Sequence, residues 1–331
     1  MGLESPAMQA TVLVEAAPEQ IHLECETCGA GLDLGPHLRT ATCPYCASPA
    51  VVERPPDANR PLPIFALAFV LPRDAALEIA HRWVKGRWFA PQAFRRASVG
   101  DTRGVYLPAY LYSAAAHAEY SAEIGENYTV TETYTDSQGK TQTRTRTETE
   151  WFSFNGRYAG YVDDVTVTAS RGIPNDELAA IEPFDLRALH RYSAKVISGW
   201  ISEEPSVGIE ECVATARGEA IEAVGTRLGQ FMPGDTYRSL QHRTWLEQED
   251  AQLVLLPVWV LAVRYREDKP MVRLLVNGQT GRLYGKRPLS WVKVVSLVLI
   301  ALLAIGLVVW RVSQPRRHRR ADVTSMVRGW A

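Results

Sequence analysis

Four of the five cysteines fall into two closely spaced pairs, and this spacing is the clearest chemical signal in the chain. Cys25 and Cys28 form one Cys-x-x-Cys pair, and Cys43 and Cys46 form the second. A tight turn of this kind directs two thiolates at one ion, and two such turns complete a tetrahedral site. The pattern therefore predicts a Zn2+ site with Cys25, Cys28, Cys43 and Cys46 as its ligands.

Two other uses of these cysteines fit the sequence less well. A rubredoxin-like iron site also uses such pairs, but usually with a longer separation and an aromatic core. A thioredoxin-like redox pair needs one Cys-x-x-Cys at the start of a helix in a βαβ unit, and none is apparent. Because four thiolates saturate the ion, we expect the zinc to be structural. We do not expect His22 or His37 to be a ligand. Cys212 lies in a helical pattern and is expected to be a small core residue.

The charge around the cysteines argues against contact with nucleic acid. Residues 1–60 carry eight acidic residues against three arginines, a net charge of −5, and four thiolates on zinc add further negative charge. Phosphate binding needs clustered Lys or Arg, whereas only Arg39 and Arg54 lie in or beside the cysteine segment. We therefore expect the segment to contact proteins.

One uninterrupted apolar run, Trp291–Trp310, lies near the end of the chain. Twenty residues in a helix span about 30 Å, the thickness of the hydrocarbon core of a bilayer. Lys293 is the only charged residue of the run and lies near enough to its end to reach the interface. A buried core helix is the alternative, but such helices are seldom apolar on every face. We expect a transmembrane helix over 291–310 and a basic tail over 311–331.

The N-terminal residues bear on orientation. They lack a basic region and a long apolar stretch, so no signal peptide is evident. We therefore expect a single-pass protein of the cell (inner) membrane whose main domain faces the cytoplasm, where thiols stay reduced. This orientation sends the tail outward, against the positive-inside tendency, because residues 311–331 carry six arginines against one aspartate.

The rest of the chain divides at a proline-rich segment. We expect, in chain order, a disordered N-terminus (1–20), a zinc ribbon (21–52), a Pro-rich linker (53–63) and a body (64–288). The predicted fold is α+β: a small N-terminal four-cysteine zinc ribbon, a mostly antiparallel α+β body and a single C-terminal transmembrane helix.

Helical spacing appears in two parts of the body. Residues 74–89 are predicted to form a helix with Asp74 as its N-cap. Residues 176–226 are predicted to be helical in two pieces, with breaks at Pro183 and near Gly199. The second piece places one apolar stripe on Ile209, Val213, Ala216 and Ala220.

Strand patterns fill the remainder of the body. Residues 104–170 are rich in β-branched and aromatic side chains, with a turn expected near Asn155-Gly156. Three further strands are expected within 236–248, 251–268 and 269–288, the last containing the turn dipeptide Asn277-Gly278.

Threonine occupies every second position over 129–135 and again over 141–149. This period of two, interrupted by the turn residues Asp136–Gly139, predicts a β-hairpin over 128–150. Pairing of Thr135 with Lys140 would mix threonines with charged side chains on both faces. Since neither face would be apolar enough to bury, we expect the hairpin to project into solvent with a loosely specified register.

The chain carries no recognisable set of catalytic residues. The motifs HExxH, GxSxG, GxxxxGK[ST] and a GxGxxG after a strand are absent. Asp163-Asp164 fits a turn or a strand end more simply than a carboxylate pair. The histidines His81, His117, His190 and His242 have no nucleophile or carboxylate arranged beside them in sequence. We therefore do not expect an enzyme.

Taken together, these segments resemble a bacterial family of TFIIB-type zinc-ribbon membrane proteins, sometimes labelled primosomal helicase-like. The resemblance covers nearly the whole chain and is carried by CxxCG…CPYC, EPFDLRALHRYSAKVISGW, LLPVWVLAVRY and VNGQTGRLYG. It implies a zinc-binding membrane platform that recruits membrane proteins or membrane-coat proteins of the SPFH or phage-shock type in envelope stress. It implies no catalytic residue, and the chain lacks any helicase motif.

The leading expectation is thus a membrane-anchored zinc-ribbon adaptor or scaffold that recruits protein partners at the cytoplasmic face. The alternative is a membrane-tethered nucleic-acid-binding protein that uses the zinc ribbon together with basic faces elsewhere. An uncharacterised hydrolase is the third possibility.

Overall fold

The computed structural model describes residues 21–34, 42–46, 48, 51–54, 61–135, 139–193, 195–269 and 271–313. The expected disordered N-terminus (1–20), His37, much of the expected linker and the tail beyond residue 313 lie outside the described residues. The strands are β1 (Ile21–Cys25), β2 (Gly31–Leu34), β3 (Val51–Arg54), β4 (Phe65–Ala66), β5 (Val99–Thr135), β6 (Thr141–Thr168), β7 (His190–Arg191), β8 (Ile201–Glu204), β9 (Thr236–Val263), β10 (Val272–Asn277) and β11 (Leu283–Gly285). The α-helices are α1 (Arg73–Lys85), α2 (Gln92–Arg96), α3 (Asn175–Ile181), α4 (Ile209–Gln230) and α5 (Trp291–Ser313).

One mixed sheet joins all of these strands. Its main path runs β11-β10-β9-β5-β8-β2-β1-β3, while β6 pairs with β5 and β4 pairs with β9 and β7. Most pairs are antiparallel, but β5 with β8 and β4 with β9 are parallel. The α+β expectation is therefore correct only in outline. The chain is dominated by one mixed sheet because β5, β6 and β9 are 37, 28 and 28 residues long and absorb segments expected to be separate.

Two expected interruptions are in fact parts of continuous strands. β6 passes straight through Asn155-Gly156, where the glycine opposes Tyr120 and lies beneath its ring, so a side chain there would collide. β9 contains both of the first two strands expected after residue 235 and joins them through a register shift opposite Ser113 and Ala115. Gln248 adopts a left-handed conformation within this irregularity (φ 51°). At both places residues typical of turns lie inside a strand, where they make room for a packed ring or form a bulge, and the chain does not reverse direction.

The helices differ from expectation mainly at their ends. α1 begins after Pro72, which takes the N-cap position expected for Asp74. α3 ends at Ile181, so most of the helix expected over 182–204 is replaced by loops and short strands. α4 buries a stripe that contains the expected Ala216 and Ala220, but Cys212 takes the place expected for Ile209 and Val213. Its members are Cys212, Ala216, Ala220, Val224 and Leu228, packed on the face of β5 and β6, while Ile209 is exposed.

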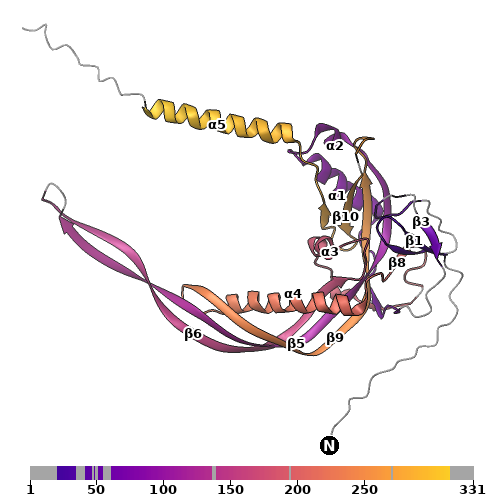
Figure 1. Cartoon of the computed structure of the whole chain (residues 1–331), viewed down its shortest axis with the longest axis horizontal. Helices are drawn as coiled ribbons and strands as arrows, with labels where there is room; N and C mark the ends of the chain where they lie inside the picture. The colour runs from indigo at the N-terminus through magenta and orange to yellow at the C-terminus, as the bar shows by residue number, and fades with distance from the viewer. Residues whose placement is uncertain are drawn as a thin grey trace, which may run out of the picture.

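The threonine-rich hairpin projects beyond the rest of the sheet (Figure 1). β9 last pairs with β5 at Gly125, so residues 126–135 and 141–150 form a two-stranded arm. Thr135 pairs with Thr141 rather than with Lys140, and this shift of one residue exchanges the two faces of one strand relative to the other. One face of the arm now carries only threonines over the pairs from 129/147 to 135/141, and the other carries Tyr128, Val130, Glu132, Tyr134, Gln142, Arg144, Arg146 and Glu148.

The cysteine-containing segment is built into the main sheet. β2 pairs with β8, placing Asp33 opposite Ser202. Leu32 and Tyr45 belong to the same buried cluster as Val105 and Leu107 of β5. The segment therefore shares its hydrophobic core with the body, although the sequence between them is rich in proline.

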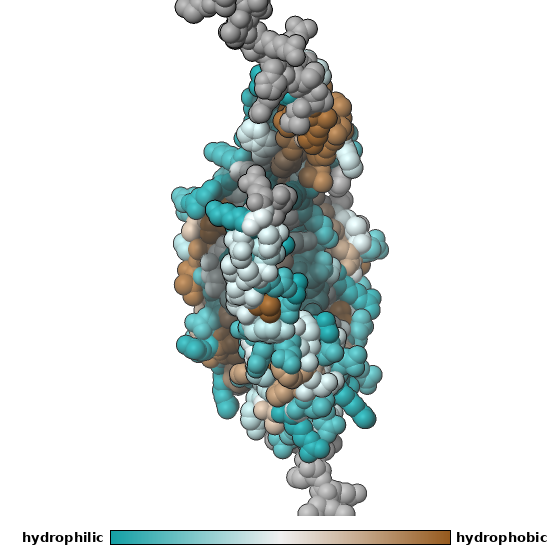
Figure 2. Space-filling model, turned by 90° about the vertical axis from the view of Figure 1, so that its left-hand side faces the viewer, coloured by the Kyte–Doolittle hydropathy of each residue, from teal (hydrophilic) through white to brown (hydrophobic). Residues whose placement is uncertain are grey.

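Beyond its first turn, α5 leaves the body as a helix that nothing else in the described chain covers. Figure 1 shows α5 and the arm projecting toward the same side of the body. The stretch Trp291–Arg311 has a mean hydropathy of 2.9, and none of the apolar window is buried. Seen from the side toward which it projects, α5 forms an apolar area near the top of the molecule (Figure 2). By length and composition this helix can span a membrane.

We predict that Gly104→Ala destabilises the body by about 1–3 kcal/mol, the usual cost of overpacking. A Cβ at Gly104 would overlap the indole of Trp200, which is held from behind by stacking on Phe69 (ring centroids 4.2 Å apart). Thermal unfolding of the detergent-solubilised chain measures the change.

Gly218→Ala in α4 is the matched control, because no atom lies within 4 Å of its added methyl group. It should stabilise the helix by roughly 0.5–1 kcal/mol. Equal unfolding temperatures for both variants would contradict the packing assigned to Trp200.

Candidate metal centre

The structure brings the four predicted ligands together. The Sγ atoms of Cys25, Cys28, Cys43 and Cys46 all lie within 4.8 Å of one another. The Sγ atoms of Cys25 and Cys46 are 3.5 Å apart, and those of Cys28 and Cys43 are 3.7 Å apart. A tetrahedron with Zn–S bonds of about 2.3 Å has edges of about 3.8 Å. All four cysteines are free of disulfides, so the donor set fits a metal such as Zn2+.

Two turns hold the sulfur atoms in place. The first follows β1, where the Gly29 amide donates to the Cys25 carbonyl (2.8 Å) and the Cys25 amide donates to the Ala30 carbonyl (3.0 Å). Gly29 has a φ of 72°, a conformation that glycine adopts at little cost. In the second turn the Cys43 amide donates to the Ser48 carbonyl (2.8 Å). Each Cys-x-x-Cys therefore closes a tight turn that exposes both sulfur atoms to one centre.

The pKa values of Cys28, Cys43 and Cys46 are compatible with a cation bound between the four thiols. The hydrogen bond between Cys28 and Cys43 lowers the pKa of Cys43 to about 5 and raises the pKa of Cys28 far above that of an ordinary thiol. Burial raises the pKa of Cys46 to about 11. Ionising all four thiols in so small a volume is costly unless a positive ion neutralises them. A bound divalent metal would supply that charge and tie the two turns together.

His22 lies at the same end of the sheet but contacts carboxylates instead of the cysteines. Its Nδ1 lies 2.5 Å from Asp33 Oδ1 and 2.9 Å from Glu204 Oε1. Because His22, Asp33 and Glu204 come from β1, β2 and β8, these contacts fasten the cysteine segment to the body. His22 therefore lies apart from the four cysteines and forms with Asp33 and Glu204 a second group of possible metal ligands.

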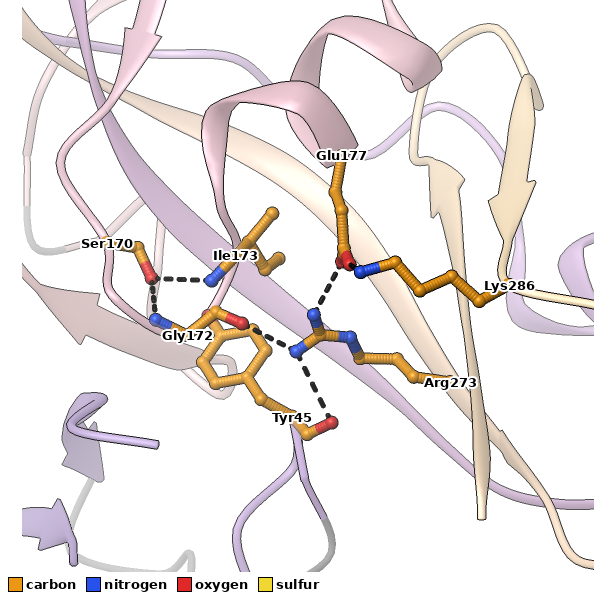
Figure 3. A network of polar contacts seen from close by, with 7 residues as sticks. All are labelled: Tyr45, Ser170, Gly172, Ile173, Glu177, Arg273 and Lys286. Carbon is orange, nitrogen blue, oxygen red and sulfur yellow. Dashed lines mark hydrogen bonds and ion pairs between the residues drawn. The ribbon is translucent and has the colours of Figure 1, made fainter. Parts of the chain in front are cut away.

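A buried polar network surrounds the second turn. The Tyr45 hydroxyl donates to Glu203 (2.6 Å), and the Ser170 hydroxyl donates to the same carboxyl group (2.5 Å). Ser170 Oγ in turn accepts hydrogen bonds from the amides of Gly172 and Ile173 (Figure 3). Glu203 is only 2% exposed, and burial is the main reason that its pKa rises to about 8. Tyr45 thus connects the metal-binding turn to a carboxyl group that is largely neutral near pH 7.

Arg273 extends this network toward α5. Its Nη1 donates to the Gly172 carbonyl (2.5 Å) and to the Tyr45 carbonyl (3.5 Å), while Nη2 pairs with Glu177 (2.5 Å). Lys286, five residues before α5, pairs with the same carboxylate (2.9 Å; Figure 3). Glu177 is buried, so its charge is acceptable only because two cations neutralise it. A continuous set of polar contacts therefore runs from the cysteine turn to the chain entering α5.

Sequence reasoning missed this network. The adjacent acids Glu203-Glu204 are the last two residues of the short strand β8, and nothing in their local sequence marks one of them as buried. Tyr45 sits inside the second Cys-x-x-Cys, where its ring must pack near the metal. Nothing local identifies Arg273, because its partners lie 96 to 228 residues away.

We predict that Cys43→Ser removes bound metal and lowers the stability of the whole body. Cys43 is buried in the cluster that also contains body residues, so loss of the ion should disturb more than one turn. Metal analysis of the purified chain should fall from one zinc per chain to none, with a lower unfolding temperature. Membrane insertion should persist because α5 makes no contact with the cysteines.

Cys212→Ala is the matched control, since Cys212 is also buried and lies in the separate cluster beneath α4. It should retain one metal per chain. Retention of metal by Cys43→Ser would show that this cysteine is not a ligand.

Glu203 should make folding stability depend on pH. Its pKa is about 8 when folded against an ordinary value of 4.5, so the folded state holds an extra proton between these values. Its favourable contribution is complete below about pH 4.5 and is lost as the pH rises through about 8. Glu203→Gln should therefore flatten the decline of the unfolding temperature over that window.

The exposed Glu126→Gln is the control and should leave the pH profile unchanged, because the described structure records no ion pair for this side chain. A profile that keeps its full slope in Glu203→Gln would assign the pH dependence to other groups.

Comparisons with known proteins assign no function to this chain. No family model matches the chain, and no solved structure matches it. The chain is similar to the uncharacterized protein YdjG of Bacillus subtilis (strain 168), with 23% identity over 234 residues. The match includes 70% of this chain and spans 65% of the length of that relative.

Proposed function

We propose that the protein is a membrane-anchored zinc-ribbon adaptor that recruits protein partners at the cytoplasmic face of the cell membrane. In this proposal the four cysteines hold one structural Zn2+, α5 crosses the bilayer once, and the chain has no catalytic activity of its own. Two features of one body carry the proposal. An exposed apolar helix leaves the body, and an exposed two-stranded arm extends its sheet.

α5 supports the membrane attachment. Its apolar side chains from Val295 to Trp310 are exposed, which is unfavourable in water and favourable in a bilayer. Its one internal charge is satisfied by the body, because Lys293 Nζ donates to the carbonyls of Trp88 (2.8 Å) and Ala90 (2.7 Å).

The distribution of positive charge supports a cytoplasmic body. The fold brings Arg287 near Arg87 and places Arg95 beside the start of α5, where the sequence alone shows only a modest basic bias. Membrane orientation depends on which flank of the span carries more Lys and Arg, and these charges offset the arginines of the tail. The free cysteines agree with this side.

The arm supports a role in binding proteins. It buries no apolar side chain against the body, so its length contributes little to the stability of the fold. Cross-strand pairs nevertheless give it a defined shape: Arg146 pairs with Glu132 (3.1 Å) and Glu148 (2.5 Å) on the mixed face. The opposite face offers a regular array of threonine hydroxyl and methyl groups. Such a preordered surface can bind a partner without a large entropic cost.

The family resemblance supplies the class of partner. It implies membrane proteins or membrane-coat proteins of the SPFH or phage-shock type, acting in an envelope-stress response. Nucleic acid stays outside the proposal because the cysteine segment is acidic.

A shortened arm tests the proposal. Replacing residues 127–149 by Asn-Gly would close the hairpin between Glu126 and Glu150, which already pair. Crosslinking in native membranes should recover protein partners with the natural chain and lose them with the shortened one. The loss is expected because the arm presents the binding surface.

Two readouts keep the result specific. The shortened chain should stay in the membrane fraction and retain one zinc per chain, which shows that the body is intact. Partners that are retained in full would contradict a binding role for the arm, and nucleic acid in the crosslinked product would contradict the adaptor function.

A further inference from the structure

The turn between α1 and α2 lies directly against the first turn of α5. The Ser290 amide donates to the Phe89 carbonyl (2.9 Å), and Lys293 donates to the carbonyls of Trp88 and Ala90. The apolar stretch of α5 begins at Trp291. Any bilayer that receives α5 therefore has its interface at the level of this turn.

The side chains of the turn suit that position. Trp88 is 73% exposed and Phe89 is 38% exposed, although both are large and apolar. Tryptophan favours the membrane interface because its ring is apolar while its N–H remains polar. A groove of about 460 Å³ separates the turn from α5 and is lined by Trp88, Phe89, Val292, Leu297 and Ile300 among others. Its apolar walls match the upper part of a lipid acyl chain.

The surrounding charge is strongly positive. Residues 79–100 contain Arg82, Lys85, Arg87, Arg95 and Arg96 and no acidic residue. In the described part of the chain none of these five forms an ion pair with a carboxylate. Burial and the nearby positive charge of Arg287 lower the pKa of Arg87. Anionic lipid headgroups would neutralise such a cluster.

We propose that α1, α2 and the turn between them form a membrane-surface element that binds anionic phospholipid. Trp88 and Phe89 enter the interface beside α5, and the five cations contact headgroup phosphates. This inference rests on the membrane anchoring proposed above. The consequence is mechanical: a second attachment next to α5 restrains the body, which a single helix would leave free to rotate about its axis.

A photocrosslinking experiment with the full chain tests the inference. Trp88→p-benzoylphenylalanine would be reconstituted in nanodiscs that contain phosphatidylcholine and phosphatidylglycerol, irradiated, and analysed for lipid adducts by mass spectrometry. Two other sites provide references: Val292, inside α5, and Tyr161, which lies on β6 and is as exposed as Trp88 (72% against 73%). Lipid adducts are expected at positions 88 and 292 and not at 161, with phosphatidylglycerol enriched at 88 over its share of the bilayer.

The outcomes separate this inference from the proposed anchoring. Adducts at 292 without adducts at 88 would overturn the surface element and leave the anchor intact. No adduct at either position would overturn the anchor itself. Adducts at 88 without enrichment of phosphatidylglycerol would overturn the headgroup assignment. If enrichment occurs, replacing Arg82, Lys85, Arg95 and Arg96 by glutamine should abolish it while adducts at 292 persist.

Discussion

The uninterrupted backbone hydrogen bonding of β5 is the constraint on which the other parts of this molecule depend. β9 pairs with one edge of the strand from Val99 to Gly125. The other edge pairs first with β8 and then, from Ala109 to the tip, with β6. Because β8 also pairs with β2, the cysteine segment is attached to the same strand that ends in the arm. A twisted sheet of such long strands resists bending locally, so its two ends keep a fixed relation.

The cysteine centre draws its rigidity from this sheet as much as from a metal. Its sulfur atoms lie against the cluster built on Val105 and Leu107, and Tyr45 carries the connection to Glu203 and Arg273. Such a centre differs from an isolated zinc module, whose fold depends on the ion alone. Here the ion would close two turns that the body already positions, and the pairing of Arg273 and Lys286 with Glu177 extends the same polar contacts to the start of α5.

Sequence patterns predicted the strand-rich regions, the stretches of α1 and α4 and the apolar helix, but they failed at boundaries and registers. Asn155-Gly156 has the composition of a turn, yet Gly156 lies inside β6 because the ring of Tyr120 needs its space. The hairpin register differs from the expected one by a single residue, since alternating threonines satisfy both pairings equally well. The α+β description missed the continuity of the long strands because bulges and packing glycines look like breaks in the sequence.

What the sequence determined by itself was local: four thiols spaced for one ion, a largely apolar stretch of twenty residues long enough to cross a bilayer, and threonines at every second position, as in a strand. Spacing within a short segment is sufficient for each of these features. The tertiary structure alone decided which groups are buried and which meet across the chain. It placed Glu203 out of water beside Tyr45, 158 residues away, and the Trp88 turn against Lys293, 205 residues away. Burial and charge pairing are properties of contacts between distant segments, so no local pattern contains them.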